Sequence, residues 1–172
     1  MKLSKPKLPP QIVGNAGLFY VCHKLSTLGW NAMPTSRNAA GVDVMCFSLD
    51  GTRKLLLQVK SLQKPDSLFM PHPDKIMGDY WVVVLGATGE KPTCYILKLE
   101  EVKSLVSKYA AKKDGKITYW LPKQLYAVED YLEMWEQKIG FGAKKPTEEQ
   151  PSDPLDDAQD DSEGNRQQEI PK

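Results

Sequence analysis

Three polar residues, Asp43, Gln58 and Lys60, stand in two apolar stretches that can form one hairpin. The stretches are joined by Asp50-Gly51, a dipeptide favoured in two-residue type I′ turns because both central residues can adopt φ > 0. This turn places Asp43 opposite Gln58, with Cβ atoms roughly 5 Å apart. Lys60 follows two residues later on the same face. The sequence therefore predicts a carboxylate, an amide and an ammonium group gathered at one end of a hairpin.

The other face of the same hairpin is apolar, because side chains alternate between the two faces of a strand. The same turn pairs small and branched apolar residues there, namely Val42 with Val59, Val44 with Leu57, and Cys46 with Leu55. One assumption about the turn thus predicts both a core face and a polar cluster.

Side chains of this kind form half of a site for a hard cation. Magnesium takes oxygen ligands and is typically held by one or two carboxylates together with substrate phosphates. The candidate ligands for Mg2+ or Mn2+ are the Asp43 carboxylate, the Gln58 amide oxygen and the Val59 backbone carbonyl. A metal so placed polarises a phosphoryl oxygen and lowers the pKa of bound water. Lys60 is the candidate for orienting that water or for stabilising charge on the phosphorane.

Plainer interpretations stay open for these residues. Asp43 can form a sheet ion pair with Lys60 or Lys54, and Gln58 and Lys60 can belong to a solvated edge. Candidate contacts to nucleic-acid phosphate flank the hairpin, and these are Arg37, Asn38 and Lys64. For the asparagine, turn formation is the ordinary explanation.

The hairpin pattern D-x14-Q-x-K follows a helix and the segment GNAGLFYVCHKLSTLGWNAMPTSRNAAGVDV. This combination resembles the PD-(D/E)xK nuclease superfamily, particularly its Q-x-K members akin to Mrr-type restriction enzymes and archaeal Holliday junction resolvases. It is also similar to a group of small uncharacterised bacterial proteins with the layout GNAGLFYV…GWNAMPT…QVK. The resemblance covers about residues 11 to 100 and implies an αβββαβ core with magnesium-dependent hydrolysis of DNA phosphodiesters.

By its motif, Asp43 is the metal-binding aspartate, Gln58 replaces the second acid, and Lys60 is the lysine. The resemblance further implies DNA as the partner and a homodimer as one expected assembly. One position departs from the pattern: many relatives carry a helix glutamate in a segment like GExxV, whereas GLFYV places Leu18 there. Two functions follow as hypotheses. The first is metal-dependent phosphodiester hydrolysis on nucleic acid, and the alternative is a catalytically degenerate domain that binds nucleic acid or a protein partner.

The elements around the hairpin are expected from the spacing of apolar residues. Five residues recur at helical spacing and predict a helix over about residues 11–28, ended by Gly29 in a left-handed conformation; they are Leu18, Val21, Cys22, Leu25 and Leu28. The run DYWVVVL predicts a strand buried on both faces. The other expected elements are strands at 30–34, 93–98 and 117–121, helices at about 99–111 and 122–139, and a long loop at 61–78.

This order predicts an α/β domain with a mixed β-sheet flanked by helices, and the resemblance makes its core restriction-endonuclease-like. Charge is divided unevenly around that domain. Residues 146–172 contain nine acidic and two basic residues, a balance of −7, whereas residues 1–145 contain 21 basic and 13 acidic residues, a balance of +8. We expect a basic arm at 1–10, the domain at 11–143 and a disordered acidic tail at 144–172.

The basic body favours a polyanionic partner, and the acidic tail can compete for the same surface or engage a protein partner. The alternative is a tail that only aids solubility.

The three cysteines, odd in number and within apolar runs, argue against a disulfide framework and a Cys-rich zinc site. No run reaches the eighteen or so apolar residues of a membrane span, and no secretory signal is visible at MKLSKPKLPP. The expected location is the cytoplasm, with no membrane partner.

Overall fold

The computed structural model describes residues 8–35, 41–110 and 115–143. A five-stranded sheet organises them in the order β1-β2-β3-β5-β6. Its strands are β1 (Asn31–Pro34), β2 (Val44–Phe47), β3 (Lys54–Leu62), β5 (Tyr80–Leu85) and β6 (Thr93–Lys98). Neighbouring strands are antiparallel except for β3 and β5, which pair in parallel. The sheet is therefore mixed, as the sequence predicts.

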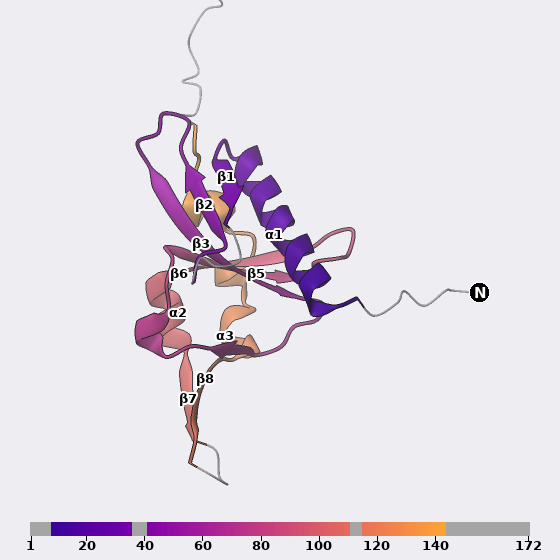
Figure 1. Ribbon diagram of the computed structural model, residues 1–172, viewed down its shortest axis with the longest axis vertical. Helices are drawn as coiled ribbons and strands as arrows, with labels where there is room; N and C mark the ends of the chain where they lie inside the picture. The colour runs from indigo at the N-terminus through magenta and orange to yellow at the C-terminus, as the bar shows by residue number, and fades with distance from the viewer. Residues whose placement is uncertain (1–7, 36–40, 111–114, 144–172) are drawn as a thin grey trace, which may run out of the picture.

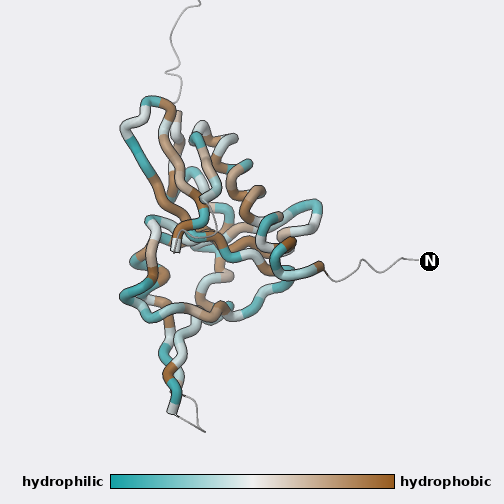
Figure 2. Tube along the Cα trace, viewed as in Figure 1, coloured by the Kyte–Doolittle hydropathy of each residue, from teal (hydrophilic) through white to brown (hydrophobic). Residues whose placement is uncertain are grey.

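The two faces of this sheet carry separate hydrophobic cores. Helix α1 (Pro10–Thr27) covers one face, where Leu25 and Leu57 are fully buried. Helices α2 (Leu99–Leu105) and α3 (Lys123–Tyr126) and a second, smaller sheet lie on the other side, where Leu121 and Tyr126 are buried (Figure 1). In Figure 2 the hydrophobic stretches concentrate in the strands of the five-stranded sheet. Residues 81–85 of β5 are all buried, which confirms the predicted strand with two covered faces.

Helix α1 lies very close to β3. A Cβ atom on Gly17 would sit 2.0 Å from Ser61 Oγ and 2.8 Å from Ser61 Cβ, so only glycine fits at this crossing. The Ser61 hydroxyl donates a hydrogen bond to the Gly14 carbonyl at 3.4 Å. Leu18 packs half-buried against the first core, and Gly29 has φ of 79°, both as expected from the sequence. The predicted first helix is thus confirmed to within one residue at each end.

The second sheet is made of β4 (Leu68–Met70), β8 (Ile117–Leu121) and β7 (Ser107–Ala110), in the order β4-β8-β7. Two sequence predictions are wrong here. The helix expected at 99–111 ends at Leu105, and the chain continues as β7 because residues 107–110 pair with β8. The loop expected at 61–78 contains the end of β3, strand β4 and a 3₁₀ turn at Pro73–Lys75. Pairing with a distant strand overrides local periodicity in both segments.

The last predicted helix, at 122–139, is also wrong. The chain instead forms α3, a 3₁₀ turn at Glu129–Tyr131 and a π turn at Trp135–Ile139. Between the two turns Glu133 adopts φ of 50°, and its carboxylate accepts hydrogen bonds from the Cys94 N–H (2.7 Å) and the Trp135 indole N–H (2.9 Å). The interruptions let this segment follow the edge strand β6 and deliver Trp135 and Ile139 to the first core.

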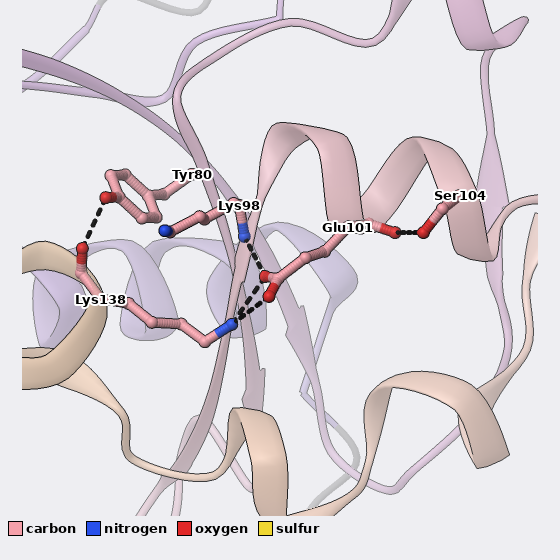
Figure 3. Close-up of polar contacts among 5 residues, drawn as sticks. All are labelled: Tyr80, Lys98, Glu101, Ser104 and Lys138. Carbon is pink, nitrogen blue, oxygen red and sulfur yellow. Dashed lines mark hydrogen bonds and ion pairs between the residues drawn. The ribbon is translucent and has the colours of Figure 1, made fainter.

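A cluster of polar contacts fixes the C-terminal segment to the sheet (Figure 3). The Lys138 ammonium lies 2.6 Å from both carboxylate oxygens of Glu101, which also accepts the Lys98 N–H at 2.6 Å. The Tyr80 hydroxyl donates to the Lys138 carbonyl at 2.5 Å. The Lys138 ammonium also lies 4.5 Å from the centre of the Tyr131 ring. These contacts join α2, β5 and the C-terminal segment.

No helix among residues 8–35, 41–110 and 115–143 has the length and apolar character needed to cross a membrane. The predicted acidic tail and most of the predicted basic arm lie outside the described residues.

Candidate functional site

The hairpin has the predicted register but a different turn. Val44 pairs with Leu57 and Cys46 with Leu55, as expected. The loop has four residues, 49–52, because Ser48 N–H still bonds the Arg53 carbonyl at 3.0 Å and Gly51 N–H bonds the Ser48 carbonyl at 2.9 Å. Since Glu133 is the one non-glycine residue with positive φ in the described part of the chain, this is not a type I′ turn. The loop is centred on the same dipeptide, so the register is unchanged.

The pairing of β2 with β3 stops at Val44 and Leu57, although β3 continues to Leu62. Just before β2, the Asp43 N–H donates to the Leu57 carbonyl at 2.8 Å, and the Asp43 carbonyl accepts from the Thr35 N–H at 2.9 Å. The predicted ladder pairs beyond this point, Asp43 with Gln58 and Val42 with Val59, do not form, because the chain bends away at Asp43. The second half of β3 keeps β5 as its neighbour on one edge, and the bend leaves its other edge to Asp43.

The Asp43 carboxylate occupies that edge. One of its oxygens, Oδ2, accepts hydrogen bonds from the Val59 backbone N–H at 2.7 Å and from the Gln58 side-chain amide. Gln58 is buried, with 8% of its surface exposed. The structure thus brings Asp43 and Gln58 together. No ion pair of Asp43 with Lys60 or Lys54 is found among the described residues.

Lys60 lies on the same face of β3 as Gln58, and both line one groove. The groove has a volume of about 550 Å³, and its wall is formed by Gly41, Gln58, Lys60, Pro71, Asp74, Lys75, Met77 and Trp81. The Lys60 ammonium is 5.5 Å from the centre of the Trp81 ring, a cation–π distance that positions its charge. Asp43 does not line the groove itself, but its carboxylate is hydrogen-bonded to the Gln58 side chain. The predicted contact between the carboxylate and the amide is thus present, and the ammonium lines the same groove as the amide.

Sequence reasoning missed the opposite wall of this groove. Asp74 and Lys75 belong to the 3₁₀ turn after β4, and the Asp74 carboxylate lies 3.3 Å from His72 Nδ1. The His72 ring in turn packs edge-on against Tyr119, with ring centres 5.0 Å apart. The signal available in the sequence was the run PHPDK, whose prolines favour a turn, but nothing local places that turn opposite Lys60.

Other sequence-predicted residues do not join the groove. Arg37 and Asn38 lie outside the described residues, and Lys64 is exposed after the end of β3. Two further carboxylates are used elsewhere: Asp79 accepts the Leu56 N–H at 2.8 Å, and Asp66 accepts the Ser67 N–H at 2.8 Å.

The donor set fits one magnesium ion shared with a substrate phosphate. No group of three or more His, Cys, Asp or Glu side chains that suits a metal occurs among residues 8–35, 41–110 and 115–143. Oxygen donors are nevertheless close together. The N–H and C=O of one strand residue point to the same edge, so the Val59 carbonyl shares the edge that Asp43 occupies. A half-turn of the Gln58 amide exchanges its NH2 for its oxygen beside Asp43. One carboxylate and two neutral oxygens suit a cation that also takes phosphate oxygens.

Two solved structures are similar to this one. A bacterial homing endonuclease, I-Ssp6803I, matches with a TM-score of 0.50 and 14% sequence identity over 76% of this chain and 92% of that chain. The Holliday junction resolvase Hjc of the archaeal hyperthermophile Archaeoglobus fulgidus has a TM-score of 0.48 and 13% identity over 74% of this chain and 97% of that chain. No family model and no curated protein matches the sequence. The chain has a restriction-endonuclease-like fold.

Proposed function

We propose that this protein hydrolyses phosphodiester bonds of nucleic acid with the help of a divalent metal, at the site formed by Asp43, Gln58 and Lys60. One observation supports the proposal: Gln58, which is hydrogen-bonded to Asp43, and Lys60 line the same groove of about 550 Å³ beyond the end of the β2–β3 pairing. The same fold occurs in a structure whose name describes a homing endonuclease. The finer likeness to Q-x-K members and to small bacterial proteins stays a prediction.

The roles follow from the chemistry of each group. Asp43, with the Gln58 and Val59 oxygens, would hold Mg2+ or Mn2+. Such an ion, when bound, polarises a phosphoryl oxygen and lowers the pKa of water. Lys60, steadied over Trp81, places a positive charge beside the scissile phosphate and donates hydrogen bonds to the attacking water or to a phosphate oxygen. Lys75, on the opposite wall, adds a second positive charge for the nucleic-acid backbone.

Cleavage of supercoiled plasmid and of branched DNA with Mg2+ or Mn2+ tests this proposal. We expect nicking by the wild type and a loss of at least about a hundredfold in Asp43→Asn and Lys60→Ala, the range seen when one charge-stabilising donor is removed. Lys54→Ala is the matched control, because Lys54 is an exposed lysine of the same strand that lies outside the groove. Cleavage that survives Lys60→Ala, or wild type that is inactive with both metals, rejects the proposal.

A second candidate function is supported by the small number of carboxylates at the site. Gln58 donates to Asp43, Leu18 packs half-buried against the core, and Asp43 belongs to no group of three or more metal-binding side chains in the described structure. These features suit a catalytically degenerate domain that binds nucleic acid or a protein partner. A wild type that binds duplex or branched DNA with a steep salt dependence, but cuts neither, supports this function. Binding and cleavage that are both absent, even after removal of residues 146–172, point instead to a protein partner.

A further inference from the structure

The small sheet has one face that the core does not use. Its inner side chains, among them Met70 and Leu121, are buried in the second core. Its outer face carries aromatic residues from all three strands, which are Phe69 of β4, Trp120 of β8 and Tyr109 of β7. Phe69 is 63% exposed and Tyr109 is 50% exposed. The strands thus present large planar side chains to solvent, away from the proposed catalytic residues.

These rings form one continuous stripe across the strands. Phe69 and Trp120 are direct partners in the β4–β8 ladder, with ring centres 5.4 Å apart and planes at 79°. The Trp120 indole N–H donates to the Thr118 hydroxyl at 3.2 Å, which holds the ring along the strand. Tyr109 pairs with Thr118 and therefore stands diagonally beside Trp120. Ser67, Tyr109, Trp120 and Pro122 line a hollow of about 400 Å³ on this face.

The charges around the stripe are mostly positive. Residues 107–110 and 115–121, which include β7 and β8, contain no acidic residue, and exposed lysines flank β8 at Lys116 and Lys123. Lys108 pairs with Tyr119 and therefore faces the other side of the sheet. Asp66, the acid nearest in sequence to β4, has its carboxylate bonded to the Ser67 N–H. Aromatic rings with a lysine beyond each end of the central strand suit a polyanion that also offers planar rings, because bases stack on aromatic side chains while ammonium groups contact phosphates.

The stripe is connected to the proposed active-site groove by a short segment. Strand β4 ends at Met70, and the next residue, Pro71, already lines the groove together with Asp74 and Lys75. The contact between His72 and Tyr119 fixes this segment to β8. The wall of the groove thus begins two residues after Phe69 along the chain.

We propose that the outer face of the β4-β8-β7 sheet binds unpaired bases of a single-stranded nucleic acid, with Phe69, Trp120 and Tyr109 as stacking surfaces. The inference rests on the proposed function in taking nucleic acid as the substrate, and it narrows the substrate class to one with unpaired bases. A second copy of this chain is the competing occupant, but apposing two copies of this face would bring their lysines together.

Tryptophan fluorescence of the full-length protein tests the inference. Trp30, Trp81 and Trp135 are buried, so Trp120 is the accessible reporter. Titration with a single-stranded thymidine oligonucleotide in EDTA should quench the emission, and duplex DNA of equal length should bind more weakly. Phe69→Ala and Tyr109→Ala should each weaken binding about fivefold to a hundredfold. Phe19→Ala, which removes a 59% exposed ring of α1, is the matched control and should bind as the wild type does.

Affinities unchanged in Phe69→Ala and Tyr109→Ala overturn the inference, as does an equal loss in Phe19→Ala. A concentration-dependent dimer that Phe69→Ala dissociates also overturns it and assigns the face to a second copy of the chain. Both exposed aromatic residues can be truncated without opening the core, and circular dichroism checks the fold. Lys60→Ala separates the two proposals, because it should abolish cleavage and leave quenching intact. If the protein cleaves with metal but shows no quenching, the proposed base-binding face is rejected and the proposed hydrolytic function is kept.

Discussion

Replacing Gly17 by alanine should destabilise the protein, although alanine is the better helix former. In a helix interior the exchange normally stabilises by about 0.5–1 kcal/mol. At Gly17 the added Cβ would meet Ser61 Oγ at 2.0 Å and Ser61 Cβ at 2.8 Å. The hydroxyl can rotate away, but Ser61 Cβ is fixed to β3 and must move by about 0.6 Å to reach an ordinary contact of 3.4 Å. Overpacking of this kind costs about 1–3 kcal/mol, so we expect a net loss of about 1–2 kcal/mol.

Gly14→Ala provides a matched control in the same helix, because no atom lies within 4 Å of a Cβ built there. This variant should gain about 0.5–1 kcal/mol. Urea denaturation of both variants measures the free energy of unfolding, with the m-value checking that the transition is unchanged. Ser61→Gly removes both opposing atoms, so the double variant with Gly17→Ala should show a favourable coupling of about 1–3 kcal/mol. A Gly17→Ala protein that is as stable as Gly14→Ala would refute the close approach of α1 to β3.

Three further predictions concern charged and titratable groups. Hydrogen bonds from the Ser48 hydroxyl and then from Thr52 lower the pKa of Asp50 to about 2. Because the folded pKa is depressed, this contribution to stability is present above the unfolded pKa of about 4 and is lost as the pH falls towards 2, so the stability difference from Asp50→Asn should shrink over that range. Burial raises the pKa of the Cys46 thiol to about 12 and also raises that of Cys94, so neither should be alkylated at pH 8 before unfolding. Lys138→Met should cost about 1–3 kcal/mol, because the pair is partly buried, with side-chain exposures of 12% and 32% for Lys138 and Glu101.

Each of these predictions has its own check. A carboxyl NMR titration of Asp50 that gives an ordinary pKa near 4 contradicts the loop hydrogen bonds. Mass spectrometry of the alkylated protein, labelled with and without urea, shows which cysteines react only after unfolding. Rapid alkylation of Cys46 in the folded protein contradicts its burial. For Lys138, a double-mutant cycle with Glu101→Gln isolates the pair, and a coupling near zero assigns the loss to packing.

The hairpin was predictable because its determinants are local. Alternating apolar residues and a central Asp-Gly fixed the register of β2 and β3, even though the loop proved to have four residues. A two-residue and a four-residue loop centred on the same dipeptide give the same pairing. The proximity of Asp43 to Gln58 followed from that register, and the bend at Asp43 then replaced the expected ladder pair by a carboxylate bonded to Val59.

The remaining errors share one cause, which is a partner far away in the sequence. Residues 107–110 leave the predicted helix because β8 pairs with them, and the interrupted segment after Pro122 follows β6 through the Tyr95–Leu132 bridge. Asp74 reaches the groove through the small sheet, to which no local pattern pointed. The spacing of apolar residues predicts which face of a segment is buried. The secondary structure of these segments depends instead on the distant strand against which they pack.

The carboxylate of Asp43 also bears on self-association of the folded protein. A strand whose backbone N–H groups face outwards can pair with a strand of another molecule. Val59 N–H is directed at Asp43, so the charged group that serves the proposed chemistry also closes this edge of β3. An alanine at this position would remove the charge and uncover a site for intermolecular strand addition, whereas asparagine keeps an acceptor for Val59. The hydrogen bond from Val59 to Asp43 therefore protects this edge of β3 from intermolecular pairing, whatever chemistry the carboxylate performs.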